Sequence, residues 1–322
     1  MLNEKLEAVL GEKGLVLGDA LTERLIPHGH PSVLLRPQST EEVAAALRLC
    51  NDAGQPVVPY GGLTGLVEAT TADESEVAIS LERMNAIEEI DIASRTMTVQ
   101  AGVPLQVVQE AAEAEGLLFP LDIGARGSAT IGGNVATNAG GNRVIRFGMM
   151  RDQILGMEVV LADGTVLSSM NKIIKNNTGY DLKQLFIGSE GTLGVVTRLV
   201  LKLRPAPTSQ NMAFLAASTF DQVTTLLNRL DAGLGGSLSA FEVMWSDYYE
   251  LVTKPPAAGH PPVAHGHSFY ILVEALGGDE EADSERFLAV LSEAMEEGIV
   301  ADGAIAQSQG ERDAMWAIRD DV

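Results

Sequence analysis

The chain has 322 residues, and its 22 Lys and Arg against 44 Asp and Glu give a formal net charge of −22 at pH 7. A hydrophobic content of 46% supports a sizeable core and excludes wholesale disorder. The negative balance argues against a nucleic-acid partner, because neutralising phosphates requires clustered Lys and Arg. The length exceeds what one hydrophobic core usually organises, so we expect two domains.

The single cysteine, Cys50, excludes an intrachain disulfide and fits a reducing compartment. It shares one face with Val43 and Leu47 on a predicted helix that begins at a Ser-x-x-Glu capping box and ends at Gly54, so we expect a buried thiol. The first residues carry charges where a signal peptide needs an apolar run, and no run of about 18 apolar residues occurs. We therefore expect a cytoplasmic protein without a transmembrane segment.

The first part of the chain alternates short strands with helices, as α/β or α+β domains do. The dipeptide Asp163-Gly164 lies between two apolar runs, which is the pattern of a β-hairpin. The predicted elements are strands over 57–58, 77–84 and 96–102, a helix between Pro104 and Gly116, and the hairpin around 163–164.

Pro205 and Pro207 mark the predicted domain boundary. Beyond them helices again alternate with strands, which favours a small α+β layer structure. The last helix runs to Val322 without a stop signal, so we expect the second domain to be incomplete. The predicted helices cover 219–230, 245–252, 280–298 and 311–322, and the predicted strands cover 237–244, 267–276 and 303–308.

Two segments are rich in glycine, a loop over 61–66 and the stretch 120–148. Seven glycines in the second segment are too many for the interior of a regular helix or strand. Backbone N–H groups with little side-chain bulk around them form concave anion sites. Residues 123–151 contain no acidic residue, so their arginines indicate a local anion, with a pyrophosphate the best match. These arginines are Arg126, Arg143, Arg146 and Arg151, and the neighbouring side-chain donors are Thr64, Ser128, Thr130, Thr137 and Asn138.

Motifs of several other sites are absent from the sequence. Neither G-x-x-x-x-G-K nor a helix-opening G-x-G-x-x-G occurs, which excludes a P-loop and leaves a Rossmann site unsupported. The absence of H-E-x-x-H and G-x-S-x-G removes zincins and α/β-hydrolases. His260, His265 and His267 lie in a Pro- and Gly-rich connection without Cys or carboxylate, so we expect structural or exposed histidines rather than a metal site. We expect the same of His28 and His30.

Four ordered segments, PVVPYGGLTGL, FPLDIGARGSATIGGNVATNAGG, RFGMMRD and DLKQLFIGSEGTLGVVT, make the chain recognisable. They resemble the FAD-binding domain of the p-cresol methylhydroxylase/vanillyl-alcohol oxidase superfamily. Within it, the chain most resembles the group of D-lactate dehydrogenases, glycolate oxidase flavoprotein subunits and D-2-hydroxyglutarate dehydrogenases. The resemblance implies an α+β fold: an N-terminal helical extension over 1–30, a two-subdomain FAD-binding domain over 31–205, and a partial α+β substrate (cap) domain with an antiparallel sheet over 206–322.

The resemblance also implies which residues hold FAD. It assigns the pyrophosphate to the first glycine loop, the flavin and ribityl chain to the start of the second segment, and the adenine end to the fourth. No histidine stands in these loops, so we expect non-covalent FAD. The implied residues are Pro59, Gly61, Gly62, Leu63, Thr64, Gly65 and Leu66, then Pro120, Leu121, Asp122, Ser128, Gly132, Gly133, Asn134, Thr137, Asn138, Gly141 and Gly148, and finally Glu190, Gly191, Gly194 and Val195.

The implied reaction is hydride transfer from a D-2-hydroxy acid to flavin, giving the 2-oxo acid. Arg319, in a W-x-x-R helix, is the candidate for binding the substrate carboxylate. Its spacing alone instead favours a surface arginine paired with Asp313 or Asp320. The family's catalytic base and metal ligands, with zinc a candidate metal, are expected beyond Val322, so no catalytic residue is identified.

The implied partners are a small 2-hydroxy acid and an electron acceptor, which is an electron-transfer flavoprotein, a quinone or a cytochrome. A homodimer is the base-rate expectation. Two alternatives stay open: a non-catalytic FAD-binding module, and an alcohol or sugar oxidase of the same fold that uses oxygen directly.

Overall fold

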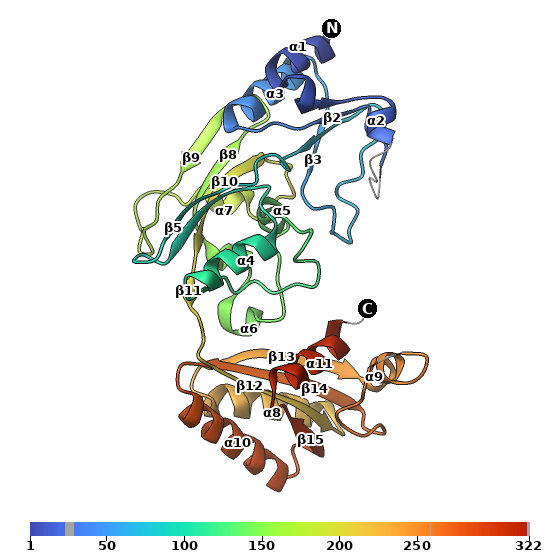
Figure 1. The fold of residues 1–322 in the computed structure, drawn as a ribbon, viewed down its shortest axis with the longest axis vertical. Helices are drawn as coiled ribbons and strands as arrows, with labels where there is room; N and C mark the ends of the chain where they lie inside the picture. The colour runs from blue at the N-terminus through green and yellow to red at the C-terminus, as the bar shows by residue number, and fades with distance from the viewer. Residues whose placement is uncertain (23–28, 258, 321–322) are drawn as a thin grey trace. The chain divides into compact units, whose positions relative to one another are not determined.

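The computed structural model describes residues 1–22, 29–257 and 259–320, and it divides into two compact units (Figure 1). Unit 1 comprises residues 1–139 and 149–205, and unit 2 comprises residues 140–148 and 206–322. The sequence predicts one continuous domain over 31–205, whereas the structure puts Gly140–Gly148 with unit 2. No helix in the described ranges is long and apolar enough to cross a bilayer.

Unit 1 contains a mixed four-stranded sheet of order β1-β2-β4-β3 and an antiparallel five-stranded sheet of order β5-β6-β10-β8-β9. One hydrophobic core connects them, running from Leu6 through Ile79 to Leu199. The strands are β1 (Leu15–Val16), β2 (Val33–Leu35), β3 (Val57–Tyr60), β4 (Val77–Ser80), β5 (Ile87–Asp91), β6 (Thr96–Gln100), β8 (Ile154–Val160), β9 (Val166–Ser169) and β10 (Val195–Lys202), and β7 (Leu117–Leu118) pairs with β11 (Arg204–Pro205).

The helices of unit 1 include two short 3₁₀ turns over Glu12–Gly14 and Met150–Gln153. The α-helices are α1 (Leu2–Leu10), α2 (Asp19–Thr22), α3 (Thr40–Asp52), α4 (Leu105–Ala114), α5 (Ile131–Ala136) and α7 (Lys183–Phe186).

Helix α3 begins where the capping signal predicts. The Oγ of Ser39 accepts a hydrogen bond from the backbone N–H of Glu42 at 3.2 Å, and the chain leaves the helix at Gly54 with a φ of 65°. Cys50 is 1% exposed in the core, and burial raises the pKa of its thiol to about 11. The predicted buried thiol is confirmed.

The predicted hairpin joins β8 to β9. Val160 pairs with Val166 across it, and the N–H of Thr165 donates to Oδ1 of Asp163 at 2.8 Å. Gly164 has a φ of 79°, a conformation that L side chains rarely adopt, so the glycine of the Asp-Gly dipeptide is required by the turn.

Unit 2 is an antiparallel sheet of order β13-β14-β12-β15 with helices on both faces (Figure 1). Leu215 of β12 packs with Phe287 in one core cluster. Its neighbour Phe214 points to the opposite face and packs with Tyr249 and Met315. The elements are α6 (Val144–Phe147), β12 (Ser209–Ala217), α8 (Phe220–Gly233), β13 (Leu238–Trp245), α9 (Ser246–Thr253), β14 (Phe269–Gly277), α10 (Glu280–Glu296), β15 (Asp302–Ile305) and α11 (Gln309–Asp320). The predicted alternation of helices and strands is confirmed.

Candidate cofactor site

The loop after β3 lies against two other predicted motifs of unit 1. A Cβ placed at Gly62 would lie 2.0 Å from the carbonyl oxygen of Ser128, and a Cβ at Gly191 would lie 2.7 Å from Cγ of Pro59. Neither position has room for a side chain. The segments around residues 59–62, 128 and 191 therefore pack directly against one another, and this packing requires glycine at positions 62 and 191.

Residues 61–66 present unused backbone donors on this surface. In the part of the chain that the structure describes, none of their N–H groups has a hydrogen-bond partner. Leu63 adopts a φ of 55°, which turns the loop sharply, and Thr64, Gly65 and Leu66 are exposed. A sharply turned run of free N–H groups is a concave anion site, so this loop fits the pyrophosphate of FAD.

The second glycine pair has a different role from the first. The segment expected to be too rich in glycine for a helix forms α5, capped by Thr130, whose Oγ1 accepts from the N–H of Gly133 at 3.3 Å. The N–H of Gly132 donates to the carbonyl oxygen of Ala101 at 2.7 Å, and a Cβ at Gly132 would lie 2.7 Å from Cβ of Ala101. Packing against Ala101 requires the small size of Gly132, and the N–H groups of Gly132 and Gly133 already have acceptors within the protein.

Asn134 of α5 supplies a buried donor without an acceptor. Its side chain is 4% exposed, and Nδ2 has no hydrogen-bond partner among the described residues. A buried unsatisfied donor costs about 1–3 kcal/mol, and an acceptor atom of a bound cofactor would remove that cost. Together with the free N–H groups of residues 61–66, Asn134 makes the site fit a bound FAD.

The remaining predicted residues of the second and third motifs are divided between the two units. Pro120, Leu121 and Asp122 lie in an irregular segment of unit 1 that precedes α5. Thr137 donates from Oγ1 to the carbonyl oxygen of Gly133 at 3.1 Å, at the end of the helix. Asn138 has a φ of 49° and accepts at Oδ1 from the N–H of Arg151 at 2.9 Å. Gly141 and Gly148 fall in unit 2.

The fourth motif is attached to α5 through its backbone. The N–H of Glu190 donates to the carbonyl oxygen of Ala136 at 2.8 Å, and Glu190 has a φ of 51°. A Cβ at Gly194 would lie 2.7 Å from Cγ1 of Val159, and Val195 opens β10. The structure thus brings the first, second and fourth predicted motifs together in unit 1.

The arginines expected to mark an anion site mainly contact protein acceptors. Arg143 donates from Nε to Oε2 of Glu274 at 2.8 Å and from Nη2 to Oε1 at 3.0 Å. Arg146 donates to the carbonyl oxygens of Leu276 and, at 3.2 Å, Ser237. All of these contacts lie within unit 2.

Arg151 donates from Nη2 to the carbonyl oxygen of Ile187 at 2.7 Å and from Nη1 to that of Gln184 at 3.0 Å. Arg126 is more than half exposed, with Nη1 4.0 Å from Oδ1 of Asp122. In the described residues, the hydrogen-bond acceptors of Arg143, Arg146 and Arg151 that the structure shows are protein groups, so these charges act at least partly within the protein.

Arg319 lies on α11 of unit 2, and its Nε donates to Oε2 of Glu242 on β13 at 2.6 Å. Spacing alone favours Asp313 or Asp320 as its partner, but this carboxylate comes from a strand 77 residues away in the sequence. Burial lowers the pKa of Arg319, but the hydrogen bond and charge of Glu242 outweigh burial and raise it above its usual value. The side chain stays 38% exposed, so it is charged and accessible to a ligand.

The histidines are placed as follows. His265 has Nε2 2.8 Å from Oγ1 of Thr253, and His267 packs edge-on against Tyr270. His260 and His30 are exposed, and His28 lies outside the described residues. Within the described ranges, no three His, Cys, Asp or Glu side chains are grouped so that they could hold a metal ion.

Comparison with known proteins agrees with this site. Residues 31–169 match the FAD binding domain family, and residues 206–322 match the C-terminal domain family of FAD linked oxidases. The mitochondrial D-2-hydroxyglutarate dehydrogenase of Bos taurus is 42% identical over 294 residues, covering 91% of this chain and 54% of its own length. The D-2-hydroxyglutarate dehydrogenase of Xanthomonas citri pv. viticola is 40% identical over 301 residues, covering 94% and 62%. The chain thus spans little more than half the length of these relatives.

Two solved structures show the same fold. A p-cresol methylhydroxylase superimposes with a TM-score of 0.77 at 16% identity, over 97% of this chain and 68% of its own. An alkyldihydroxyacetonephosphate synthase superimposes with a TM-score of 0.77 at 19% identity, over 99% of this chain and 66% of its own. The predicted α+β fold is confirmed, and FAD is the cofactor. The chain thus combines an FAD binding domain over residues 31–169 with a C-terminal domain of the FAD linked oxidase family over residues 206–322.

Proposed function

We propose that the protein is an FAD-dependent dehydrogenase that oxidises a D-2-hydroxy acid to the 2-oxo acid, with D-2-hydroxyglutarate the favoured substrate. Two relatives at 40% and 42% identity carry the name D-2-hydroxyglutarate dehydrogenase, which supports this substrate class. The observation that carries the proposal is Arg319, a charged and accessible guanidinium held by Glu242.

In the reaction, a carbon–hydrogen bond and an oxygen–hydrogen bond of the substrate break, a carbonyl forms, and two electrons and two protons leave the substrate. FAD, when bound, supplies the acceptor for these electrons. Residues 61–66 would hold its pyrophosphate on their free N–H groups, and Nδ2 of Asn134 would donate to a further acceptor of the cofactor.

Arg319 would bind the substrate carboxylate. Glu242 occupies Nε, which leaves the terminal nitrogens to form the paired hydrogen bonds that a guanidinium makes to a carboxylate. Tyr248 holds the end of α11, the helix that carries Arg319, because its hydroxyl donates to the carbonyl oxygens of Ile318 at 3.1 Å and Arg319 at 2.9 Å. The guanidinium is thereby positioned before the substrate arrives, which lowers the entropy lost on binding.

A dehydrogenase of this kind passes its electrons onward. We expect an electron-transfer flavoprotein, a quinone or a cytochrome as acceptor, and the net charge of −22 favours a basic partner surface.

The test is an anaerobic titration of the FAD-loaded protein, in which the visible absorption of oxidised flavin reports reduction. D-2-hydroxyglutarate should bleach the flavin, and L-2-hydroxyglutarate should not. Substitution Arg319→Gln should raise the concentration of D-2-hydroxyglutarate needed to bleach the flavin by about tenfold or more, because one charged hydrogen-bonding partner of the carboxylate is lost. Substitution Arg229→Gln removes another arginine of unit 2, paired with Glu293 and Glu297, and should change nothing. Flavin that stays oxidised with every D-2-hydroxy acid would refute the proposal.

A further inference from the structure

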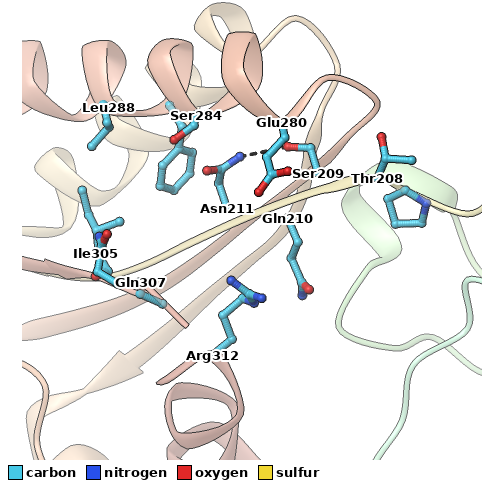
Figure 2. A pocket seen from close by; sticks show the side chains of 13 residues that line it. Thr208, Ser209, Gln210, Asn211, Glu280, Ser284, Leu288, Ile305, Gln307 and Arg312 are labelled. Atoms are coloured by element: carbon cyan, nitrogen blue, oxygen red, sulfur yellow. Dashed lines mark hydrogen bonds between the residues drawn. The ribbon is translucent and has the colours of Figure 1, made fainter. Parts of the chain in front are cut away.

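A cavity of about 460 Å³ opens in unit 2 beside the first residues of β12 (Figure 2). Strand β15 pairs only with residues 213–216 of β12, so in the described ranges no strand lies beside residues 209–211 on that side. Helix α10 and the chain over 305–307 form the walls. The cavity contains neither Arg319 nor any residue assigned to FAD, so it is a separate site.

The lining of this cavity is mainly polar. Hydroxyl and amide side chains, which both donate and accept hydrogen bonds, form its largest group. Leu288 and Ile305 add an apolar wall on one side (Figure 2). A cavity of this volume is in the range that holds a small ligand, and its polar lining favours a polar one. The polar members are Thr208, Ser209, Gln210, Asn211, Ser284 and Gln307.

Two charged side chains of opposite sign also line the cavity, and neither has an ionic partner. Arg312 donates from Nε and Nη2 only to Oε1 of Gln309, at 3.3 and 3.0 Å, and forms no ion pair within the described residues. Glu280 makes neither a side-chain hydrogen bond nor an ion pair there. Figure 2 shows Glu280 on the same side of β12 as Asn211, and Arg312 on the same side as Gln210, so the two charges flank the unpaired end of β12.

The carboxylates nearest to Arg312 in the sequence are bonded elsewhere. Oε2 of Glu311 accepts from the N–H of Gln307 at 2.6 Å, and Oδ1 of Asp313 accepts from Nε2 of Gln309 at 2.7 Å. The Nη1 atom of Arg312 is thus available to bind an anionic group in the cavity. The carboxylate of Glu280 is available to bind a cationic group.

We propose that this cavity binds a small zwitterion of the amino-acid class, with its carboxylate on Arg312 and its ammonium on Glu280. A zwitterion satisfies both charges at once, whereas a simple anion or cation leaves one of them without a partner. Leu288 and Ile305 would contact the aliphatic part of its side chain. A 2-hydroxy acid lacks the ammonium group, so the ligand of this cavity differs from the proposed substrate.

Calorimetric titration with L-leucine and L-glutamine tests the proposal on the FAD-loaded protein. The analogues 4-methylpentanoate and 3-methylbutylamine each keep one charge of leucine and should bind about tenfold more weakly than leucine, or not at all. The substitutions Arg312→Gln and Glu280→Gln should each weaken binding by a similar factor. Arg286→Gln, on α10 but outside the cavity, is the matched control and should bind as the unsubstituted protein does.

Circular dichroism and flavin content establish that the variants fold. If Arg312→Gln fails to fold, Glu280→Gln decides, because that exposed side chain has no partner to lose. The proposal is overturned if neither amino acid binds, if 4-methylpentanoate binds as well as leucine, or if both cavity variants bind leucine like the control.

Discussion

Arg143 and Glu274 form a two-bond ion pair in which the carboxylate is completely closed to solvent and the guanidinium is 18% exposed. Each carboxylate oxygen has a second donor: Oγ of Ser239 lies 2.8 Å from Oε2, and Nε2 of Gln210 lies 3.0 Å from Oε1. Because its hydrogen bonds are satisfied, the buried charge is tolerated. The pair attaches Gly140–Gly148, the last part of the glycine-rich stretch 120–148, to strand β14 of unit 2.

Removing one member of this pair should destabilise unit 2. The substitution Glu274→Ala leaves the Arg143 guanidinium largely buried without its partner, and we expect a loss of about 3–5 kcal/mol in the free energy of unfolding. Denaturant unfolding followed by circular dichroism measures it. The control Glu293→Ala breaks an exposed ion pair with Arg229 and should cost about 0–1 kcal/mol. Equal losses in the two variants would contradict this account.

The Glu274 carboxylate should also make the stability of the folded protein depend on pH in the acid range. Burial acts to raise the pKa of Glu274, but the hydrogen bonds and charge of Arg143, with Ser239 and Gln210, outweigh it and hold the pKa below its ordinary value. The stabilisation that the Glu274 carboxylate contributes to the folded protein is therefore complete above the pKa of an unfolded glutamate, about 4.3. It is lost as the pH falls through the lower pKa of the folded state.

Unfolding midpoints measured between neutral pH and about pH 3 should accordingly fall more steeply for the unsubstituted protein than for Glu274→Gln. Parallel curves for the two proteins would show that this carboxylate is not the group responsible.

The Cys50 thiol should be inert in the folded protein. It is 1% exposed, and its pKa is raised to about 11 by burial, so almost no thiolate is present at neutral pH. Ellman's reagent should release little colour from the native protein and one equivalent after denaturation. Fast reaction in the native state would show that α3 opens readily.

The sequence predicts those features that depend on neighbours along the chain. Ser39 caps α3 and Gly164 turns the hairpin because each acts within a few residues of itself. Helix α5 could not be predicted, because its glycines are explained by packing of Gly132 against Ala101 from a distant segment.

The partners of the site arginines are also set by the fold. Arg143 and Glu274 are 131 residues apart in the sequence. The sequence therefore shows the positive charge of Arg143 but does not identify the acceptor of its hydrogen bonds. Likewise the pairing of Arg319 with Glu242 follows from the packing of α11 in unit 2. Motif order was sufficient to predict the cofactor, whereas side-chain roles required the structure.

Asn134 should distinguish the apo protein from the FAD complex. Because Nδ2 is buried without a partner, Asn134→Leu, of similar size, should leave the stability of the apo protein unchanged or raise it. The same substitution should weaken FAD binding by about tenfold, since a donor to the cofactor is lost. Thermal unfolding with and without FAD measures both effects. A large loss of apo stability with unchanged affinity would assign Asn134 a purely structural role.

The central claim is that the loop over residues 61–66 binds the pyrophosphate of FAD, and FAD titration of two glycine variants tests it most directly. A Cβ at Gly62 would lie 2.0 Å from the carbonyl oxygen of Ser128, so Gly62→Ala must displace the loop, whereas a Cβ at Gly65 would meet nothing within 4 Å. Followed by flavin fluorescence, Gly62→Ala should weaken FAD binding by about tenfold or more, and Gly65→Ala by about threefold or less. Circular dichroism should show both apo variants folded. Unchanged affinity in a folded Gly62→Ala variant would contradict the claim.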